Sequence, residues 1–292
     1  MANAESGTGS PLSPNSSPPS GGFPTTRDGL MRRIADTDMS GPPEAIRTAF
    51  ASLFPPAPPL PRRTIGGVPC GVAGPEGAPP ALWLHGGGLV LGSPDTHAAA
   101  VRHVAQAAAC RIVVPQYPLA PERPWPAQRD ACLAVLDALP GAVPVVGDSV
   151  GGQLALILAM RHPGRVSGLA LISPNTDRTG RSTTRERTGD LMNDDAGDRG
   201  FARMAFGDAD PRDVEVSPLL GDLSVLPPTL ILTAGAEILQ DDGLLLARAA
   251  SLAGADVTLR TWPGLWHLWP LWPDILPEAR AALDAVAARV AR

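Results

Sequence analysis

The sequence contains no lysine, so arginine supplies all 24 of its basic residues. This absence excludes every mechanism that depends on a lysine side chain. Phosphate-binding P-loops and protein kinases need one to hold phosphate. Pyridoxal enzymes and Schiff-base aldolases need its amine as a nucleophile, and Ser-Lys hydrolases need it as a catalytic partner of the serine. Covalent chemistry in this chain must therefore use serine, cysteine, histidine, a carboxylate or a metal.

Cysteine, positive charge and long apolar segments are also scarce. Three cysteines are too few, and odd in number, for a disulfide framework, which favours a reducing compartment and a cytoplasmic protein. The net charge of −5, with no basic stripe, argues against a nucleic-acid partner. Residues 154–160 form the longest clean apolar run near a helix, far too short for a membrane span. The first 30 residues lack an apolar signal core.

Proline and glycine are abundant, at 34 and 31 residues, but 44% of the chain is hydrophobic. Residues 1–26 are mostly Ser, Gly, Pro, Asn and Thr, a composition that predicts a disordered tail. Residues 27–54 contain an amphipathic helical pattern, and the prolines of 55–61 predict a stiff connector. We therefore expect N-terminal helices and a connector over residues 27–61, followed by a larger domain over 62–292.

Strand-length apolar runs alternate with helical patterns after residue 62. The predicted strands are 81–84, 112–115, 143–147, 166–172, 229–233 and 257–261. The predicted helices are 95–110, 126–139, 153–161, 241–252 and 277–290. This alternation predicts an α/β fold with a mostly parallel central sheet and helices on both faces. Residues 175–222 interrupt it, and their seven arginines and eleven acidic residues give a net charge of −4. Such an insertion predicts a lid or cap, with a solvated surface excursion as the alternative.

A glycine-rich turn follows the predicted strand 143–147. Its sequence Gly147-Asp148-Ser149-Val150-Gly151-Gly152 matches the G-x-S-x-G nucleophile elbow, between a strand and a helix as that motif requires. The tight turn tolerates only small flanking residues and presents the serine hydroxyl above the sheet edge. The alternative is an ordinary strand-to-helix turn.

A second glycine-rich segment, His85-Gly86-Gly87-Gly88, follows the predicted strand 81–84. Acyl transfer creates an oxyanion that backbone N–H groups must already face, and glycine lets the backbone approach closely. We expect Gly86, Gly87 and Val150 to donate to this oxyanion. A dinucleotide-binding loop is the rival interpretation, but the glycine spacing differs and no acidic ribose partner is evident. His85 is expected to anchor the loop.

The base and its acid are sought after the last two predicted strands. His267 follows the strand 257–261, whereas His97 and His103 lie in a helical pattern and His162 follows a helix. A catalytic imidazolium needs a carboxylate on its second nitrogen, and the candidates after strand 229–233 are Glu237, Asp241 and Asp242. Glu237 is favoured, because a loop position suits a triad acid better than the first turn of a helix.

These motifs together resemble the hormone-sensitive-lipase family of α/β-hydrolases, in its bacterial esterase branch. The resemblance covers residues 62–292 and extends to further matching segments. They are Tyr117-Pro118-Leu119-Ala120-Pro121-Glu122, Ser217-Pro218-Leu219, Leu226-Pro227-Pro228-Thr229 and the loop from Trp262 to His267. The family's acid is usually Asp in an acid-x-Leu triplet, which here is Glu237-Ile238-Leu239. The 30-residue interval from Glu237 to His267 is the family's usual one.

The resemblance implies an α/β-hydrolase with a small helical cap and a Ser149-His267-Glu237 triad. It implies a serine carboxylester hydrolase acting on small-molecule esters with short- to medium-chain acyl groups, without metal or organic cofactor. The cap would comprise residues 27–60 and 175–222. Alternatives on the same fold are a deacetylase, a triad-bearing cyclase or dehydratase, or a non-catalytic binding protein. The sequence is also compatible with a homodimer.

Two positions depart from the family's pattern. Val150 replaces the usual Ala, and Trp266 is bulky where the family has a small residue or Pro. We expect Leu89 and Trp266 to contact substrate. Four tryptophans surround His267 in the sequence: Trp262, Trp266, Trp269 and Trp272. They form either an aromatic wall for the substrate or packing for the final helix.

Overall fold

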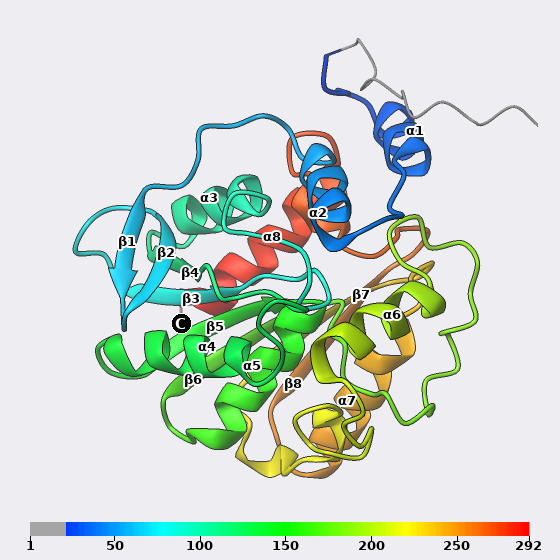
Figure 1. The fold of residues 1–292 in the computed structure, drawn as a ribbon. Coiled ribbons are helices and arrows are strands. Elements are labelled where there is room, and N and C mark those ends of the chain that lie inside the picture. Colours follow the sequence, from blue (N-terminus) through cyan, green and yellow to red (C-terminus); the bar gives the residue numbers. More distant parts are fainter. Residues whose placement is uncertain (1–21, 292) are drawn as a thin grey trace, which may run out of the picture.

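A computed structural model describes residues 22–291 of the chain. Its centre is one eight-stranded sheet with the order β1-β2-β4-β3-β5-β6-β7-β8 (Figure 1). The strands are β1 (Arg62–Ile65), β2 (Val68–Ala73), β3 (Pro80–Leu84), β4 (Arg111–Pro115), β5 (Val143–Asp148), β6 (Val166–Ile172), β7 (Thr229–Ala234) and β8 (Val257–Trp262). Strands β3 to β8 run parallel, whereas β2 pairs antiparallel with both β1 and β4.

Helices cover both faces of this sheet. They are α3 (Ala98–Ala107), α4 (Ala127–Ala138), α5 (Val150–Arg161), α7 (Gln240–Leu252) and α8 (Pro277–Val290). Helix α3 packs on α8 on one side, and α4 packs on α5 on the other (Figure 1). Helix α5 is apolar all round, and ten of its twelve residues are buried. The predicted α/β class, with a mostly parallel sheet covered on both faces, is confirmed.

Two strands were not predicted, β1 and β2. Strand β1 is largely exposed and begins with two arginines, and β2 contains Pro69 and Gly71. Neither has the continuous apolar run that marks a strand buried on both faces. They form the antiparallel edge of the sheet, where proline and polar residues are tolerated.

The N-terminal amphipathic stretch forms two helices, α1 (Arg27–Asp36) and α2 (Pro43–Ser52). Thr26 caps α1 by accepting a hydrogen bond from the N–H of Gly29, and α2 begins with Pro43 at its first position. Residues 55–61 form an extended connector without helix, as their prolines dictate. Of the predicted disordered tail, residues 1–21 lie outside the described residues.

The polar segment 175–222 contains one α-helix, α6 (Asp195–Phe206), which was not predicted. Asp194 caps it by accepting a hydrogen bond from the N–H of Gly197, and Asp195 and Asp198 lie in its first turn. This N-terminal pattern is a helix signal that the high polarity of the segment obscured. No helix among residues 22–291 is both long enough and apolar enough to cross a bilayer.

Candidate active site

Ser149 occupies the tight turn between β5 and α5. Its backbone has φ 54° and ψ −122°, a strained conformation for a residue with a side chain. A Cβ on Gly147 would lie 2.3 Å from the carbonyl oxygen of Gly151, and a Cβ on Gly151 would lie 1.9 Å from that of Leu84. The turn therefore requires glycine on both sides of the serine, as the nucleophile-elbow motif predicts.

A chain of hydrogen bonds links Ser149 to His267 and Glu237. The Nε2 atom of His267 lies 2.9 Å from Ser149 Oγ, and its Nδ1 atom lies 3.1 Å from Glu237 Oε2. Glu237 is in the turn after β7 and His267 in the loop after β8. The three side chains thus come from the carboxyl ends of parallel strands, where the active sites of such sheets form. All three residues are buried.

The other two candidate acids have different partners. Asp241 accepts hydrogen bonds from the N–H and the hydroxyl of Thr183, both at 2.7 Å. Asp242 accepts from the N–H groups of Thr176 and Asp177. Of the three carboxylates proposed from the sequence, Glu237 is the one that contacts His267.

The surroundings of His267 favour the protonated ring. Burial by itself lowers the pKa of His267, but the hydrogen bond and negative charge of Glu237 outweigh this effect and raise the pKa above 6.5. A proton taken up by the ring is therefore stabilised, which is what a general base next to a hydroxyl requires.

The structure corrects the predicted role of Gly86. Its N–H donates to Asp148 Oδ2 at 2.8 Å, so it is not free to face an oxyanion. The N–H groups of Gly87, Gly88 and Val150 donate no hydrogen bond within the part of the chain that the structure describes. Gly87 and Gly88 have φ values of 112° and 62°, in the region that favours glycine. A Cβ on Gly88 would also lie 2.8 Å from the Cβ of Phe201.

Asp148 anchors the glycine-rich loop through its hydrogen bond with the N–H of Gly86. Its buried carboxylate also accepts from Trp83 Nε1 at 2.8 Å and lies 3.0 Å from His97 Nε2. His85 stacks on Tyr117, whose hydroxyl donates to the carbonyl oxygen of His85 at 2.7 Å. Burial, helped by the charge of His97, lowers the pKa of His85 to about 3, so this ring stays neutral. These contacts are those of an anchor, as the sequence analysis expected of His85.

The remaining histidines lie in structural positions. His103 is paired with Asp284 at 2.8 Å between α3 and α8. His162 ends helix α5. His267 is therefore the histidine whose ring contacts the elbow serine.

A cavity of about 50 Å³ opens beside Ser149. Its lining comes from α2, α6 and their flanking residues, and from the loops after β3, β5 and β8: Met39, Phe50, Gly87, Gly88, Leu91, Ser149, Met192, Asn193, Asp198, Phe201, His267 and Leu268. Leu89 and Trp266, the two residues expected to contact substrate, are absent from this lining and lie in the hydrophobic core. The bulk of Leu91 and Phe201 faces the cavity in their place.

The tryptophans near His267 serve packing. Trp269 begins a short 3₁₀ turn, Trp269–Leu271, that packs against α8, and Trp272 directly follows this turn. Trp272 Nε1 donates to the carbonyl oxygen of Leu53 at 2.8 Å, which ties this turn to the end of α2. Trp266 packs against Trp272 with ring centroids 6.5 Å apart. Of the two interpretations given for these tryptophans, packing for the final helix describes this cluster.

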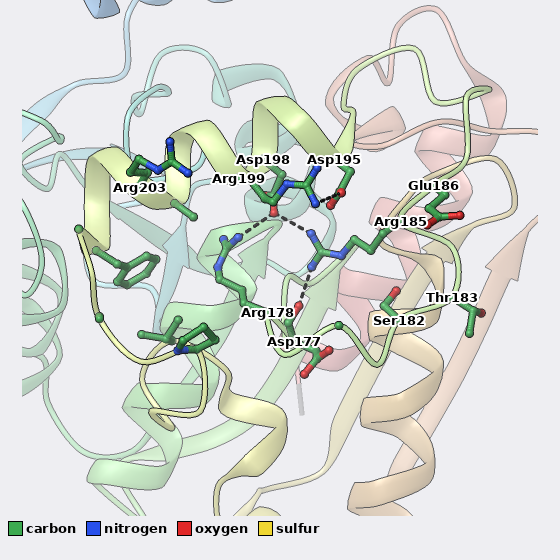
Figure 2. A pocket seen from close by; sticks show the side chains of 17 residues that line it. Asp177, Arg178, Ser182, Thr183, Arg185, Glu186, Asp195, Asp198, Arg199 and Arg203 are labelled. Atoms are coloured by element: carbon green, nitrogen blue, oxygen red, sulfur yellow. Dashed lines mark hydrogen bonds and ion pairs between the residues drawn. The ribbon is translucent and has the colours of Figure 1, made fainter.

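Asp198, which lines the cavity beside Ser149, belongs to a buried charge network with Arg178 and Arg185 (Figure 2). Asp198 Oδ2 accepts from Arg178 at 2.7 Å and from Arg185 at 2.6 Å, and Arg185 also donates to Asp242 at 2.9 Å. Asp198 Oδ1 accepts from the side chain of Asn175, whose N–H donates to the carbonyl oxygen of Ser149. The network thus joins α6 to the elbow. Sequence reasoning missed it, because its members are spread over residues 175–242.

A second and larger cavity, of about 660 Å³, lies beyond Asp198 and under α6. Asp198 lines both cavities. The side chains of Arg178 and Arg185 meet at its carboxylate, as Figure 2 shows. Arg178 and Arg185 pair with Asp198, and Arg185 also pairs with Asp242. Two positive charges therefore face two negative charges, so the arginines at this wall are already neutralised.

The fold and the site define the class of this protein. The family model described as alpha/beta hydrolase fold matches residues 81–271, which include the elbow, the glycine-rich loop, Glu237 and His267. The chain belongs to this family.

Known relatives narrow the class further. The chain is 35% identical over 219 residues to an acetyl-hydrolase of Streptomyces hygroscopicus, covering 71% of this chain and 73% of the relative. It is 35% identical over 217 residues to an esterase of Acinetobacter venetianus, covering 70% and 72%. A solved esterase of the bacterial hormone-sensitive lipase family superposes with a TM-score of 0.82 at 31% identity, over 90% of this chain and 95% of that one. The resemblance predicted from the motifs is confirmed.

Proposed function

We propose that this chain is a serine carboxylester hydrolase that works through an acyl-enzyme intermediate. The observation that carries the proposal is the buried hydrogen-bond chain from Ser149 Oγ through His267 to Glu237. Ser149 Oγ attacks the ester carbonyl carbon while His267 Nε2 takes the hydroxyl proton. Glu237 holds the ring in the required tautomer and stabilises the imidazolium that forms.

The oxyanion of the tetrahedral intermediate faces the N–H groups of Gly87, Gly88 and Val150. These donors lie on the loop after β3 and at the first position of α5, on two sides of Ser149. Fixed N–H groups near developing charge stabilise the transition state without reorganising. The hydrogen bond from Gly86 to Asp148 holds the loop in place.

The reaction ends with release of the alcohol and transfer of the acyl group from Ser149 to water. His267 gives its proton to the leaving alkoxide, which departs as the alcohol, and Ser149 remains acylated. Water then attacks the acyl carbon while His267 takes its proton, and return of that proton to Ser149 Oγ releases the carboxylic acid. Neither half-reaction needs an amine, in keeping with a chain that contains no lysine.

The acyl group is proposed to be short to medium in length, with a preference for the short end. The cavity beside Ser149 holds about 50 Å³ and is lined on one side by Phe50 of α2 and Phe201 of α6. We propose that α1, α2 and the 175–222 segment form a cap over residues 62–292. The relatives named acetyl-hydrolase and ethyl acetate hydrolase agree with a small acyl group. Cytoplasmic location and homodimerisation stay predictions of the sequence.

Turnover of p-nitrophenyl acetate, butyrate and octanoate tests the proposal. We expect the wild type to hydrolyse acetate and butyrate fastest, and Ser149→Ala to lower kcat by roughly four to six powers of ten. Ser251→Ala is the matched control, because this serine is exposed on α7 and its loss should spare the activity. Folded wild type that hydrolyses none of these activated esters would contradict the proposal.

A further inference from the structure

The segment 183–192 of the polar insertion runs along the turn that carries Glu237. Thr184 Oγ1 donates to the carbonyl oxygen of Ile238 at 2.7 Å and accepts from the N–H of Asp241 at 3.1 Å. Arg187 Nη1 donates to the carbonyl oxygen of Gly235 at 2.7 Å. We call residues 183–192 the strap. It holds the backbone on both sides of Glu237 from outside the sheet.

Asp190 extends this hold to the base. Its Oδ2 accepts from the N–H of Ile238, the residue directly after Glu237, at 3.1 Å. Its Oδ1 accepts from the N–H of His267 at 3.0 Å and from the N–H of Met192 at 3.1 Å. One carboxylate therefore joins the turn after β7 to the loop after β8, beside the backbone hydrogen bond from the N–H of Ala236 to the carbonyl oxygen of Leu265 at 2.9 Å.

Asp190 also carries a charge that no cation neutralises within residues 22–291. No ion pair among these residues includes it, and its partners are backbone N–H groups. Three carboxylates act on His267: Glu237, which touches the ring, Asp190 in the strap and Asp148 in β5. Asp148 is already paired with His97. Of the three, Asp190 is the one that comes from the insertion.

We propose that Asp190 is a positioning residue that fixes the His267-Glu237 pair from the strap and stabilises the protonated ring of His267. The inference rests on the proposed function, because it assigns Asp190 to the base of that reaction. Two physical effects follow. The carboxylate ties the two loops together at the His267-Glu237 pair, and its charge, like the charge of Glu237, raises the pKa of His267. Asp190 is not among the cavity-lining residues, so substrate binding does not depend on it directly.

The variant Asp190→Asn tests this assignment. Asn keeps the size and removes the charge, and its amide NH₂ replaces one acceptor that faces a backbone N–H. We expect kcat on p-nitrophenyl acetate to fall about 10- to 100-fold, because small misplacements of a catalytic pair are costly. We expect KM to change by less than about twofold, and the acid limb of kcat/KM to move to lower pH by about half a unit or more.

Two further variants separate the effect of the Asp190 charge from the effect of the strap's hydrogen bonds. Asp194→Asn makes the same charge change four residues along, where the carboxylate caps α6 and contacts Gly197 instead of His267. It should leave kcat and the acid limb unchanged. Thr184→Val cuts the strap's two hydrogen bonds to residues 238 and 241 while keeping the Asp190 charge. It should lower kcat without moving the acid limb.

An acid limb that stays in place in Asp190→Asn, or moves equally in Thr184→Val, would overturn the role of the charge. An unchanged kcat in Asp190→Asn would overturn the positioning role. The wild type and Ser149→Ala, assayed beside them, keep this outcome distinct from failure of the proposed function. If wild type turns over the ester and Ser149→Ala does not, a negative result for Asp190 concerns Asp190 alone.

Discussion

At the scale of single residues, the charge of each buried carboxylate is matched to a particular donor set. Asp148 receives the N–H of Gly86 and the rings of Trp83 and His97, so it holds the glycine-rich loop. Glu237 receives the His267 ring and the N–H of Ala234 at 2.7 Å, so it holds the base. A buried carboxylate without such donors would lose its charge.

The pH profile follows from the raised pKa of His267. Attack requires the neutral ring, so activity is present above this pKa and is lost as the pH falls through it. We expect the acid limb of kcat/KM in the wild type to lie above pH 6.5. Glu237→Gln removes the carboxylate charge, so we expect this limb to move to lower pH and kcat to fall about 10³- to 10⁴-fold. A pH series with p-nitrophenyl acetate measures both.

Asp241→Asn is the control for this prediction, because Asp241 contacts Thr183 and not His267. It should lower kcat far less than Glu237→Gln does, because Asp241 reaches the pair only through the strap residue Thr183. A larger loss in Asp241→Asn than in Glu237→Gln would reassign the acid.

At the scale of elements, α6 and α2 decide how much space an acyl group has. Phe201 of α6 presses on the oxyanion loop, where a Cβ on Gly88 would lie 2.8 Å from its Cβ. Phe50 of α2 and Leu91 complete the apolar side of the cavity. The polar insertion thus supplies an apolar wall next to the nucleophile, although its composition is mostly charged.

Phe201→Ala should enlarge this cavity. We expect the ratio of kcat/KM for p-nitrophenyl hexanoate over acetate to rise about tenfold, the equivalent of about 1.4 kcal/mol of added transition-state contact. Phe206→Ala removes a ring of the same helix that does not line the catalytic cavity, so it should leave the ratio unchanged. The measurement is a chain-length series on both variants. An equal ratio in wild type and Phe201→Ala would place the acyl chain elsewhere.

At the scale of the whole molecule, a buried charge network connects the insertion to the catalytic domain. Arg185 is the centre of this network, because its guanidinium reaches both Asp198 and Asp242. The charge and hydrogen bonds of Arg178 and Arg185 outweigh burial and lower the pKa of Asp198. Both arginines therefore favour the ionised form of Asp198.

Arg185→Met should destabilise the fold by about 3 kcal/mol, because it leaves two buried carboxylates without this partner. Arg199→Met removes an exposed pair with Asp195 and should cost less than about 0.5 kcal/mol. Urea unfolding followed by circular dichroism gives both values. Similar losses in the two variants would mean that the buried network adds nothing to stability.

The sequence alone was sufficient for the features that depend on local chemistry. The elbow around Ser149 needs glycine at fixed positions, and the sequence placed His267 and the candidate acids Glu237, Asp241 and Asp242 after strands that end at one edge of a parallel sheet. Continuous apolar runs predicted the parallel strands β3 to β7, because a strand buried on both faces has no polar alternation, whereas the predicted strand β8 alternates and lies at the half-exposed edge of the sheet. These are properties of short segments, and short segments carry their own signals.

Only the tertiary structure decided which groups meet across long separations. The N–H of Gly86 is used by Asp148, 62 residues away, and this contact excludes it from the oxyanion. Leu89 and Trp266 turned inward to the core, and Asp190 reached the loop of His267 from 77 residues away. Such pairings depend on how the insertion folds back over the sheet, which no local pattern records. Sequence determined the chemistry available to this protein, and packing decided which donor, acceptor and charge each catalytic group receives.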